Sequence, residues 1–561
     1  MLKQTDTSET VRLSQSINDE EIKYVMVRKT LIKEWLNSLE IYCELEDVPN
    51  IVLLGSGGGE RAAVGMLGSL FQLEQDNLLG SLLYMCGVSG TTWCMSSLYS
   101  DLDWSLNKRC DEVIEKLKGP TVDLKKAVDW LKQWKDSDQD FNLTDFWGAF
   151  TACYFMKEMD TRRLSEEAHR NSTNPYPIYS AIELDRNKQH CTKAVWFEMT
   201  PHECGFSGLG AFIDTSCLRC KFEGGIMTEK RKEMDMVLLQ GICGSVIADG
   251  QMDIAYVGKK IWDLLFGGHE SMMLKENMNM VGGSRKVEVR ECVPSQVVRC
   301  VSELIMYTED PDPLKTREVI TTLGQLLEGL VSSKGEMLWN MDSESWKRTS
   351  LVERKKFIET VSLELILTSD SWAKDWKDQR CTCIDTNVPS SMASKEKIHL
   401  VDAGLKMNSP YPPVLRPSRE VDLIISLDFS EGDPFETVFS AKKYALQQKV
   451  PFPPVKESVR DEKDRPQGCY VFEGRRPEEP TIMHMPLFNL QNCKGEEEIK
   501  KEREKYKTIH LHYDEPEIEH LLKKAKDNLK NNKYRILVQI IMAVQRRKNR
   551  KSVVRWPVSV V

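Results

Sequence analysis

A serine framed by glycines has the setting in this chain that best suits covalent chemistry. Ser89 lies in the run Gly-Val-Ser-Gly-Thr-Thr-Trp over 87–93, after an apolar strand candidate at 82–85 and before a helix-compatible segment over 91–99. A turn between strand and helix would expose the hydroxyl, and the N-terminus of the helix favours developing negative charge on its oxygen. A lone Gly-x-Ser-Gly is common in ordinary turns, so the motif needs an oxyanion hole and a base beside it.

A second glycine turn, upstream of the first, offers the backbone donors that a serine nucleophile needs. Residues 51–61 read Ile-Val-Leu-Leu-Gly-Ser-Gly-Gly-Gly-Glu-Arg. A phosphate cradle would need Lys-Ser or Lys-Thr where Glu60 and Arg61 stand, and the dinucleotide fingerprint would need glycine at 61. An oxyanion hole made by the N–H groups of Gly58 and Gly59 fits better, with a purely structural turn as the alternative. Losing one such donor typically costs about 3–4 kcal/mol of transition-state stabilisation.

The base that would activate Ser89 is either a histidine or a carboxylate. None of the nine histidines stands in a pattern typical of a catalytic base, and His202 is the best of them. Asp402, in Val-Asp-Ala-Gly-Leu, lies where an apolar run ends in a small-residue turn. Burial in an apolar pocket would raise its pKa from an unperturbed value of about 3.9 towards that of an efficient base. These patterns favour a Ser89–Asp402 dyad, with His202 as the alternative base.

The sixteen cysteines are scattered, many of them within apolar runs, and are expected to be buried free thiols. The pairs Cys217-x-x-Cys220 and Cys381-x-Cys383 have no second pair or nearby histidines at ligand spacing. We therefore predict no metal site and no cofactor.

Hydrophobic periodicity indicates the elements that must position these groups. Residues 18–43 predict an amphipathic helix with Asn18 and Glu21 as a capping pair. Further strand-like or packed segments are expected at 175–182, 194–200 and 238–246, and a central strand at 421–428. No linker composition divides the chain. We expect an N-terminal helical segment at 1–44, one catalytic domain at 45–520 with insertions at 268–295 and 340–356, and a basic C-terminal segment at 521–561.

Composition restricts the classes of partner. A net charge of −8 argues against nucleic acid. The sequence shows neither a secretory h-region nor about 18 uninterrupted apolar residues, which predicts a cytoplasmic protein. The C-terminal segment is strongly basic around the apolar run 536–544. It could bind an anionic membrane at about 1 kcal/mol per basic residue, or be a solvated helix with a basic tail.

Seven ordered motifs, spread from about residue 45 to 490, resemble those of the cytosolic (group IV) phospholipases A2, and most closely the family's short gamma form. They are 54–62 (Leu-Gly-Ser-Gly-Gly-Gly-Glu-Arg-Ala), 87–93, 143–147 (Leu-Thr-Asp-Phe-Trp), 175–179 (Pro-Tyr-Pro-Ile-Tyr), 196–201 (Trp-Phe-Glu-Met-Thr-Pro), 401–405, and 419–430 followed by Asp433-Pro-Phe-Glu-Thr.

The resemblance implies a patatin-like α/β fold, with a central mixed sheet flanked by helices and a lid or cap insertion over the serine. It implies that Ser89 is the nucleophile, Asp402 its base, and Gly58 and Gly59 the oxyanion hole. Arg61 and Arg419 match family arginines that would contact the substrate, although a solvated surface position for Arg419 is the alternative. The substrates would be phospholipids and lysophospholipids, cleaved through an acyl-enzyme that could also transfer its acyl group to another lipid.

Two departures, one from the larger family members and one from the prenylated gamma form of some species, shape the expected regulation. The roughly fifty residues before the core are too few for a calcium-binding C2 domain, which predicts calcium-independent activity. The chain ends Arg-Trp-Pro-Val-Ser-Val-Val without a prenylation box. We expect a phospholipase A2 and lysophospholipase on the periphery of intracellular membranes. The rivals are a catalytically weak lipid-binding or scaffolding protein, and a Ser–His–Asp esterase that uses His202.

Overall fold

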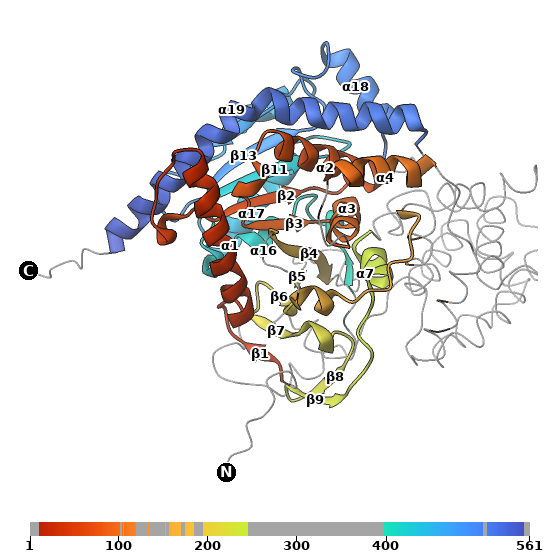
Figure 1. The fold of residues 1–561 in the computed structure, drawn as a ribbon, viewed down its shortest axis with the longest axis vertical. Helices are drawn as coiled ribbons and strands as arrows, with labels where there is room; N and C mark the ends of the chain where they lie inside the picture. The colour runs from red at the N-terminus through yellow and green to blue at the C-terminus, as the bar shows by residue number, and fades with distance from the viewer. Residues whose placement is uncertain are drawn as a thin grey trace, which may run out of the picture.

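The computed structural model describes residues 10–100, 104, 106–118, 157–169, 174–183, 195–244, 398, 400–508 and 513–554, with isolated residues between 130 and 156 (Figure 1). The insertions expected at 268–295 and 340–356 lie outside the described residues.

One mixed sheet organises the described part of the chain. Its 11 strands follow the order β1-β7-β6-β5-β4-β3-β2-β11-β13-β12, and β10 pairs with β4 beside this path. Strands β4, β3, β2, β11 and β13 are adjacent in this order and parallel to one another. Antiparallel strands flank them, with β5, β6, β7 and β1 on one side and β12 on the other. The strands are β1 (Arg12–Leu13), β2 (Ile51–Gly55), β3 (Tyr84–Gly87), β4 (Tyr176–Glu183), β5 (Val195–Met199), β6 (Glu203–Phe206), β7 (Ala211–Asp214), β10 (Leu400–Asp402), β11 (Leu423–Asp428), β12 (Tyr470–Phe472) and β13 (Thr481–Pro486), with β8 (Lys221–Glu223) and β9 (Ile226–Glu229) as a separate hairpin.

The predicted α/β fold with a central mixed sheet is confirmed. The expected central strand is β11, which lies between β2 and β13 and is buried along its whole length. An uninterrupted apolar run is typical of a parallel strand that is covered on both faces. Strand β3 begins at Tyr84, two positions later than predicted, because its parallel register with β2 pairs Val52 with Tyr84 and Gly55 with Gly87.

The packed segment expected at 238–246 is not a strand. It belongs to helix α7 (Met236–Cys243), whose first turn is capped by the Asp235 carboxylate accepting from the Leu238 N–H at 3.1 Å. All eight residues of this helix are buried. Because a helix that is covered on every side shows no polar face, its apolar run could not be distinguished from a strand by periodicity.

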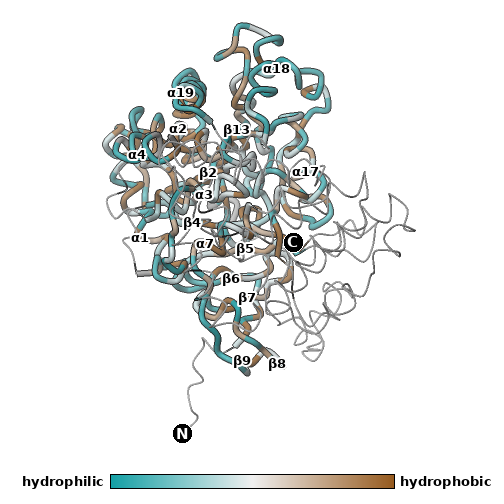
Figure 2. Tube along the Cα trace, turned by 90° about the vertical axis from the view of Figure 1, so that its right-hand side faces the viewer, coloured by the Kyte–Doolittle hydropathy of each residue, from teal (hydrophilic) through white to brown (hydrophobic). Residues whose placement is uncertain are grey.

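Helices stack in two levels against the sheet. In Figure 1, α19 (Glu515–Val554) lies across α2 (Gly59–Gln75) and α4 (Leu106–Lys118), and α2 also packs against α3 (Gly90–Tyr99). The close approach of α19 to α2 depends on Gly68, since a Cβ there would lie 2.9 Å from the Leu522 carbonyl oxygen. Figure 2 shows the hydrophobic residues gathered on the central strands and their facing helices, whereas α18 (Glu496–Lys505) is mostly hydrophilic. Helices α16 (Tyr411–Val414) and α17 (Glu436–Gln448) follow β10 and β11 in the described part of the chain.

The N-terminal helix α1 (Asp19–Ser38) is joined to the core by a buried ionic cluster. Asn18 caps it as predicted, but its side chain accepts from the Glu20 N–H at 2.7 Å, and Glu21 has another role. The Glu21 carboxylate accepts hydrogen bonds from both Nε and Nη2 of Arg419, at 2.9 and 3.0 Å. The Glu198 carboxylate on β5 accepts hydrogen bonds from Nη1 and Nη2 of Arg419 at 3.0 and 2.9 Å, and it also forms an ion pair with Arg416. Two arginines thus face two buried carboxylates.

We predict that Arg419→Met lowers the free energy of unfolding by about 3–5 kcal/mol, because it leaves Glu21 and Glu198 buried with less compensating charge. Urea unfolding followed by circular dichroism measures this loss. Arg460→Met, at a largely exposed ion pair with Glu457, is the matched control and should cost less than about 1 kcal/mol. Equal losses for the two variants would contradict a special role for the buried cluster.

Candidate active site

Loops at the carboxyl ends of three parallel strands meet at one place on the sheet edge. Strand β2 runs into the glycine loop, β3 runs into Ser89, and β11 runs into Phe429 and Ser430. Open α/β sheets bind their ligands at this edge, where the chain leaves neighbouring strands in different directions.

Ser89 occupies a strained elbow between β3 and α3. Its backbone has φ 53° and ψ −132°, and its side chain is almost wholly buried. Such a conformation costs a non-glycine residue on the order of 1–3 kcal/mol and persists only where the surroundings impose it. The elbow is held by the Val88 N–H donating to the Gly55 carbonyl at 3.3 Å, and by Thr92, whose N–H and hydroxyl both donate to the Ser89 carbonyl at 2.9 and 2.5 Å.

The glycine loop packs directly on this elbow. A Cβ on Gly90 would lie 1.8 Å from the Gly59 carbonyl oxygen, and one on Gly57 would lie 2.9 Å from the Ser89 Cβ. Gly58 and Gly59 have φ of 148° and 58°, values that other residues rarely adopt. The two predicted oxyanion donors therefore start helix α2 immediately beside the predicted nucleophile.

Strand register brings Asp402 to the same place. On β4, Tyr179 pairs with Gly87 of β3, and Ala181 pairs with Asp402 of β10. Because β5 occupies the other edge of β4 at these positions, β3 and β10 share one edge and meet end to end. Two positions along a strand span about 7 Å, so Asp402 lies close to where the chain turns into Ser89.

The surroundings of Asp402 agree with this placement. Its side chain is fully buried, and one carboxylate oxygen accepts from the Gly404 N–H at 2.8 Å. Burial and the negative charge of Asp402 both raise the pKa of the Cys243 thiol, which lies within hydrogen-bonding reach of Thr92. Asp402 thus shares a buried environment with the first turn of the helix that follows Ser89.

Asn408 is a residue of this site that the sequence did not single out. Its carbonyl accepts from the Gly57 N–H at 2.8 Å, and its side-chain amide donates to the Gly57 carbonyl at 3.2 Å and to the Ser430 hydroxyl at 2.6 Å. The segment that carries Asp402 therefore also clamps the glycine loop. The Asn-Ser-Pro run at 408–410 reads as a turn signal and gives no hint of a contact so distant in the sequence.

Arg61 lies behind the glycine loop and is fully buried. Its Nε donates to the Phe429 carbonyl at 2.6 Å, Nη1 donates to the Tyr506 carbonyl, and Nη2 donates to the Thr508 hydroxyl at 3.1 Å. Burial lowers the pKa of this guanidinium from its usual value. These contacts join α2 to the ends of β11 and α18, while binding of the lipid phosphate by Arg61 stays a prediction.

Arg419 lies in the buried cluster with Glu21 and Glu198, so the expectation of a solvated surface position is wrong. Its remaining guanidinium hydrogen bond, from Nη1, goes to the Pro413 carbonyl at 2.7 Å. Its five N–H groups are directed at protein acceptors. This geometry favours a structural role, and a substrate contact for Arg419 stays a prediction.

The histidines whose side chains the structure describes are engaged away from Ser89. His202 Nδ1 lies 2.8 Å from the Tyr176 hydroxyl, at the start of β4, whereas Ser89 follows the opposite end of β3. His520 pairs with Glu502 at 2.9 Å. His484 donates from Nε2 to the Pro434 carbonyl at 2.7 Å, and burial lowers its pKa to about 4.

A second buried carboxylate lies beneath the site. Asp428 ends β11 and accepts from the Ser430 N–H at 2.8 Å, and burial raises its pKa to about 7. The Ser430 hydroxyl in turn accepts a hydrogen bond from the Asn408 side-chain amide. Within the described ranges, no group of three or more histidines, cysteines or carboxylates is arranged to hold a metal ion, and the described cysteines are free and buried.

Comparison with known proteins identifies the fold and the family. The family model of the lysophospholipase catalytic domain matches residues 51–249. A solved structure of human GIVD cytosolic phospholipase A2 superposes with a TM-score of 0.68 at 20% identity, over 96% of this chain and 66% of that one. Another structure of that protein is a complex with methyl gamma-linolenyl fluorophosphonate.

Sequence relatives decide the family. Human cytosolic phospholipase A2 gamma is 30% identical over 95% of this chain and 96% of its own length. The chain belongs to the cytosolic phospholipase A2 family. The mouse gamma form is similar at 29% identity over 93% of this chain. As a member of the cytosolic phospholipase A2 family, the protein is a phospholipase A2 or lysophospholipase, a hydrolase of lipid esters.

We predict that Gly90→Ala lowers turnover at least about 100-fold, because the new methyl group would push the Gly59 carbonyl and its helix away from Ser89. Hydrolysis of a soluble short-chain ester, with the melting temperature measured in parallel, tests the prediction. Gly432→Ala is the matched control, since its Cβ would meet nothing within 4 Å and its activity should be unchanged. Full activity in Gly90→Ala would show that the contact does not position the catalytic loops.

Proposed function

We propose that the protein hydrolyses acyl esters of glycerophospholipids and lysophospholipids through a Ser89–Asp402 dyad. The observation that carries this proposal is the pairing of β3 and β10 along one edge of β4, which brings the two residues together at the glycine loop. The buried position of Asp402 meets the condition under which a carboxylate becomes an effective base.

In the proposed first step, the Ser89 Oγ attacks the ester carbonyl carbon while its proton passes to Asp402. The N–H groups of Gly58 and Gly59 stabilise the oxyanion. Collapse of the tetrahedral intermediate breaks the ester C–O bond, and the leaving lysophospholipid oxygen takes the proton from Asp402. Water, deprotonated by Asp402, then attacks the acyl-enzyme and releases a fatty acid. A lipid hydroxyl that replaces this water would give transacylation.

Phospholipids and lysophospholipids are the proposed substrates because the family acts on lipid esters and a solved relative binds a fatty-acyl fluorophosphonate. Calcium independence is proposed because the scheme needs no metal ion: Asp402 accepts the proton of Ser89, and backbone N–H groups stabilise the negative charge of the oxyanion.

Acyl release from vesicles of phosphatidylcholine and lysophosphatidylcholine in EDTA tests this mechanism. We predict that Ser89→Ala and Asp402→Ala each abolish release, whereas His202→Ala keeps it because His202 lies at the far end of β4. Wild-type release should be unchanged when calcium replaces EDTA. Loss of activity in His202→Ala with retained activity in Asp402→Ala would favour the Ser–His–Asp esterase. A folded but inactive wild type would favour the lipid-binding rival.

The outer face of α19 is proposed to contact membrane. Half of the apolar run at 536–544 faces the protein, since Ile536, Ile540, Ala543 and Val544 are buried. Tyr534, Val538, Ile541 and Met542 are 78%, 50%, 44% and 40% exposed and share one helix face. Several basic residues of the segment bind the protein itself: Arg546 donates to Gly474, Arg547 pairs with Glu420, and Arg550 donates to Pro477. Within the described ranges, no helix has the length and apolarity to cross a bilayer.

We predict that the triple change Tyr534→Ser, Val538→Ser and Ile541→Ser lowers binding to vesicles of phosphatidylcholine with phosphatidylserine at least about tenfold. Co-sedimentation measures the binding, and hydrolysis of a soluble ester checks that the site is intact. Leu446→Ser, which removes an 80% exposed leucine from α17, should leave binding unchanged. Unchanged binding of the triple variant would exclude α19 as the membrane contact.

A further inference from the structure

One buried carboxylate lies beneath the glycine loop without a part in the proposed chemistry. Asp428 ends β11 and is only 2% exposed. Its Oδ1 accepts from the Ser430 N–H at 2.8 Å, whereas its Oδ2 has no hydrogen-bond partner among the described residues. Burying a carboxylate with one oxygen unpaired costs free energy, so its presence at this place points to a function.

A continuous series of hydrogen bonds leads from Asp428 to the proposed nucleophile. The turn that Asp428 caps presents the Ser430 hydroxyl to the Asn408 amide, 2.6 Å away. Asn408 in turn holds both polar groups of Gly57, its amide donating to the carbonyl at 3.2 Å and its carbonyl accepting from the N–H at 2.8 Å. A Cβ on Gly57 would lie 2.9 Å from the Ser89 Cβ and 3.5 Å from the Ser89 Oγ. A change at Asp428 can therefore reach the reacting hydroxyl.

Phe429, the middle residue of the same turn, forms a second link to the glycine loop. Its N–H donates to the Ser56 hydroxyl at 2.6 Å, and its carbonyl accepts from the Arg61 Nε at 2.6 Å. The same carbonyl oxygen would lie 2.8 Å from a Cβ on Gly58. The turn after Asp428 thus contacts the loop on both sides of Gly57.

The charge of Asp428 is set by opposing influences from several elements. Burial raises its pKa to about 7, while hydrogen bonds from Ser430 and the charges of Arg503 on α18 and Arg61 on α2 oppose the shift. Asp428 therefore gains or loses its proton in the neutral pH range.

Two further titratable groups face Asp428, and neither balances its charge. His484 on β13 lies with its Nε2 4.0 Å from the Asp428 Oδ2, but burial lowers the pKa of this imidazole to about 4 and keeps it neutral. Tyr411 on α16 has a pKa raised first by burial and further by the charge of Asp428, so its phenol also stays neutral.

We propose that Asp428 is a positioning residue of the active site, whose carboxylate form holds the glycine loop against Ser89 and whose protonation loosens that hold. A carboxylate accepts charge-assisted hydrogen bonds, which are roughly twice as strong as those to a neutral group. Uptake of one proton weakens the turn at 428–430 and, through Ser430 and Asn408, the placement of Gly57. The inference rests on the proposed function and adds a pH control of the same site.

The test compares Asp428→Asn with the wild type across the neutral pH range. The amide oxygen of the variant still accepts from the Ser430 N–H, but its side chain is neutral at every pH, like protonated Asp428. We expect its kcat on a soluble short-chain ester to be about fivefold below wild type at about pH 8 and the same as wild type at about pH 6. A ratio that does not change with pH would overturn the proposal, because a purely structural loss carries no titration.

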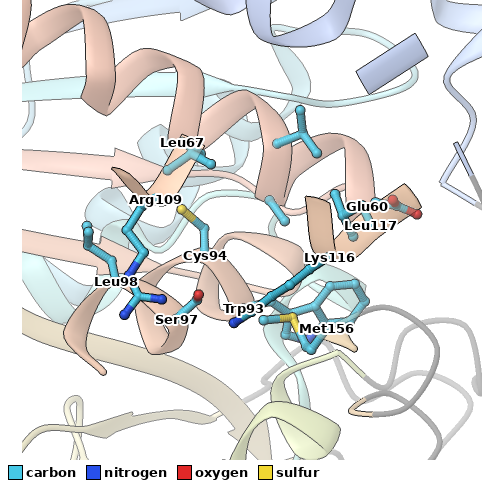
Figure 3. A pocket seen from close by; sticks show the side chains of 12 residues that line it. Glu60, Leu67, Trp93, Cys94, Ser97, Leu98, Arg109, Lys116, Leu117 and Met156 are labelled. Carbon is cyan, nitrogen blue, oxygen red and sulfur yellow. The ribbon is translucent and has the colours of Figure 1, made fainter. Parts of the chain in front are cut away.

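Taking the ratio of the two proteins removes the contribution of other acids. Asp402 has to be ionised in the proposed mechanism, and it is present in both proteins. Figure 3 shows Glu60, the acid next to Gly59, at one end of an apolar slot of about 50 Å³ between α2, α3 and α4. Burial raises the pKa of Glu60 to about 8, and this group is also common to both proteins. Asp428 alone differs between them.

Asp214→Asn is the matched control. Asp214 ends β7 in the same Asp-x-Ser turn, its Oδ1 accepting from the Ser216 N–H at 2.9 Å, but β6, β5 and β4 separate it from β3. Its activity relative to wild type should stay at about one at both pH values.

Ser430→Ala tests the route from Asp428 to the loop. In that background, adding Asp428→Asn should change kcat less than about twofold at about pH 8, because residues in one network are not additive. The full fivefold effect in that background would overturn the proposal.

Stability gives a second reading of the same proton. The folded state keeps the Asp428 proton up to about pH 7, whereas the unfolded chain releases it near about pH 3.9. Wild-type stability therefore falls as the pH rises between these values and levels off above them. Asp428→Asn lacks this loss, so its melting temperature should rise relative to wild type between about pH 5 and 7. No relative gain would overturn the proposal, while a gain in stability with a loss of turnover separates positioning from general damage.

Hydrogen exchange makes the test independent of catalysis. Mass spectrometry follows the peptide that contains Gly57 in Ser89→Ala, with and without Asp428→Asn, and each pair is compared at the same pH. Exchange about fivefold faster in the double variant at about pH 8, and equal at about pH 6, would support the positioning role even if the wild type hydrolysed no ester and the proposed function failed. Equal exchange at both pH values would overturn the role of Asp428 while leaving the dyad mechanism in place.

Discussion

The contact between the Gly59 carbonyl and the backbone of Gly90 is the constraint on which the rest of the site depends. Two helices begin at that contact, and a side chain on Gly90 would separate them. Gly59 is constrained differently, by its φ of 58° and by the Thr508 carbonyl oxygen, which would lie 3.1 Å from a Cβ. The backbone donors of one turn and the hydroxyl of the other are therefore placed by main-chain packing, which is stiffer than any arrangement of flexible side chains. Strands β2 and β3, paired in parallel up to Gly55 and Gly87, bring the two turns to this contact.

The third component of the site reaches it by a different route. Strand β10 continues the line of β3 along β4, and the seven residues from Asp402 to Asn408 join the carboxylate to the clamp on Gly57. Ser430 and Asp428 extend the same hydrogen-bond network to the end of β11. Arg61 braces the loop from the other side through Phe429 and Thr508. The glycine loop is thus fixed by several elements, which allows Ser89 to keep its strained backbone.

The sequence predicted the parts of the site that carry local signatures. Glycines before and after a serine, and an aspartate at the end of an apolar run, are patterns within a few residues, and the structure brings all of them to one sheet edge. It did not predict Asn408, because Asn408 and Gly57 are 351 positions apart. For the same reason the sequence left a surface position possible for Arg419, since its partners Glu21 and Glu198 lie hundreds of residues away along the chain. Helix α7 was missed because it is apolar on every side.

The order of these elements along the chain also determines when the candidate site can be assembled during synthesis. The glycine loop and Ser89 leave the ribosome hundreds of residues before Asp402, the Asn408 clamp and the anchors of Arg61 at Tyr506 and Thr508. Domains fold as units once their last contacting segments are available. A nascent chain that still lacks residues 402–508 would therefore hold Ser89 beside an unbraced glycine loop, and under the proposed mechanism it would have no base for that serine.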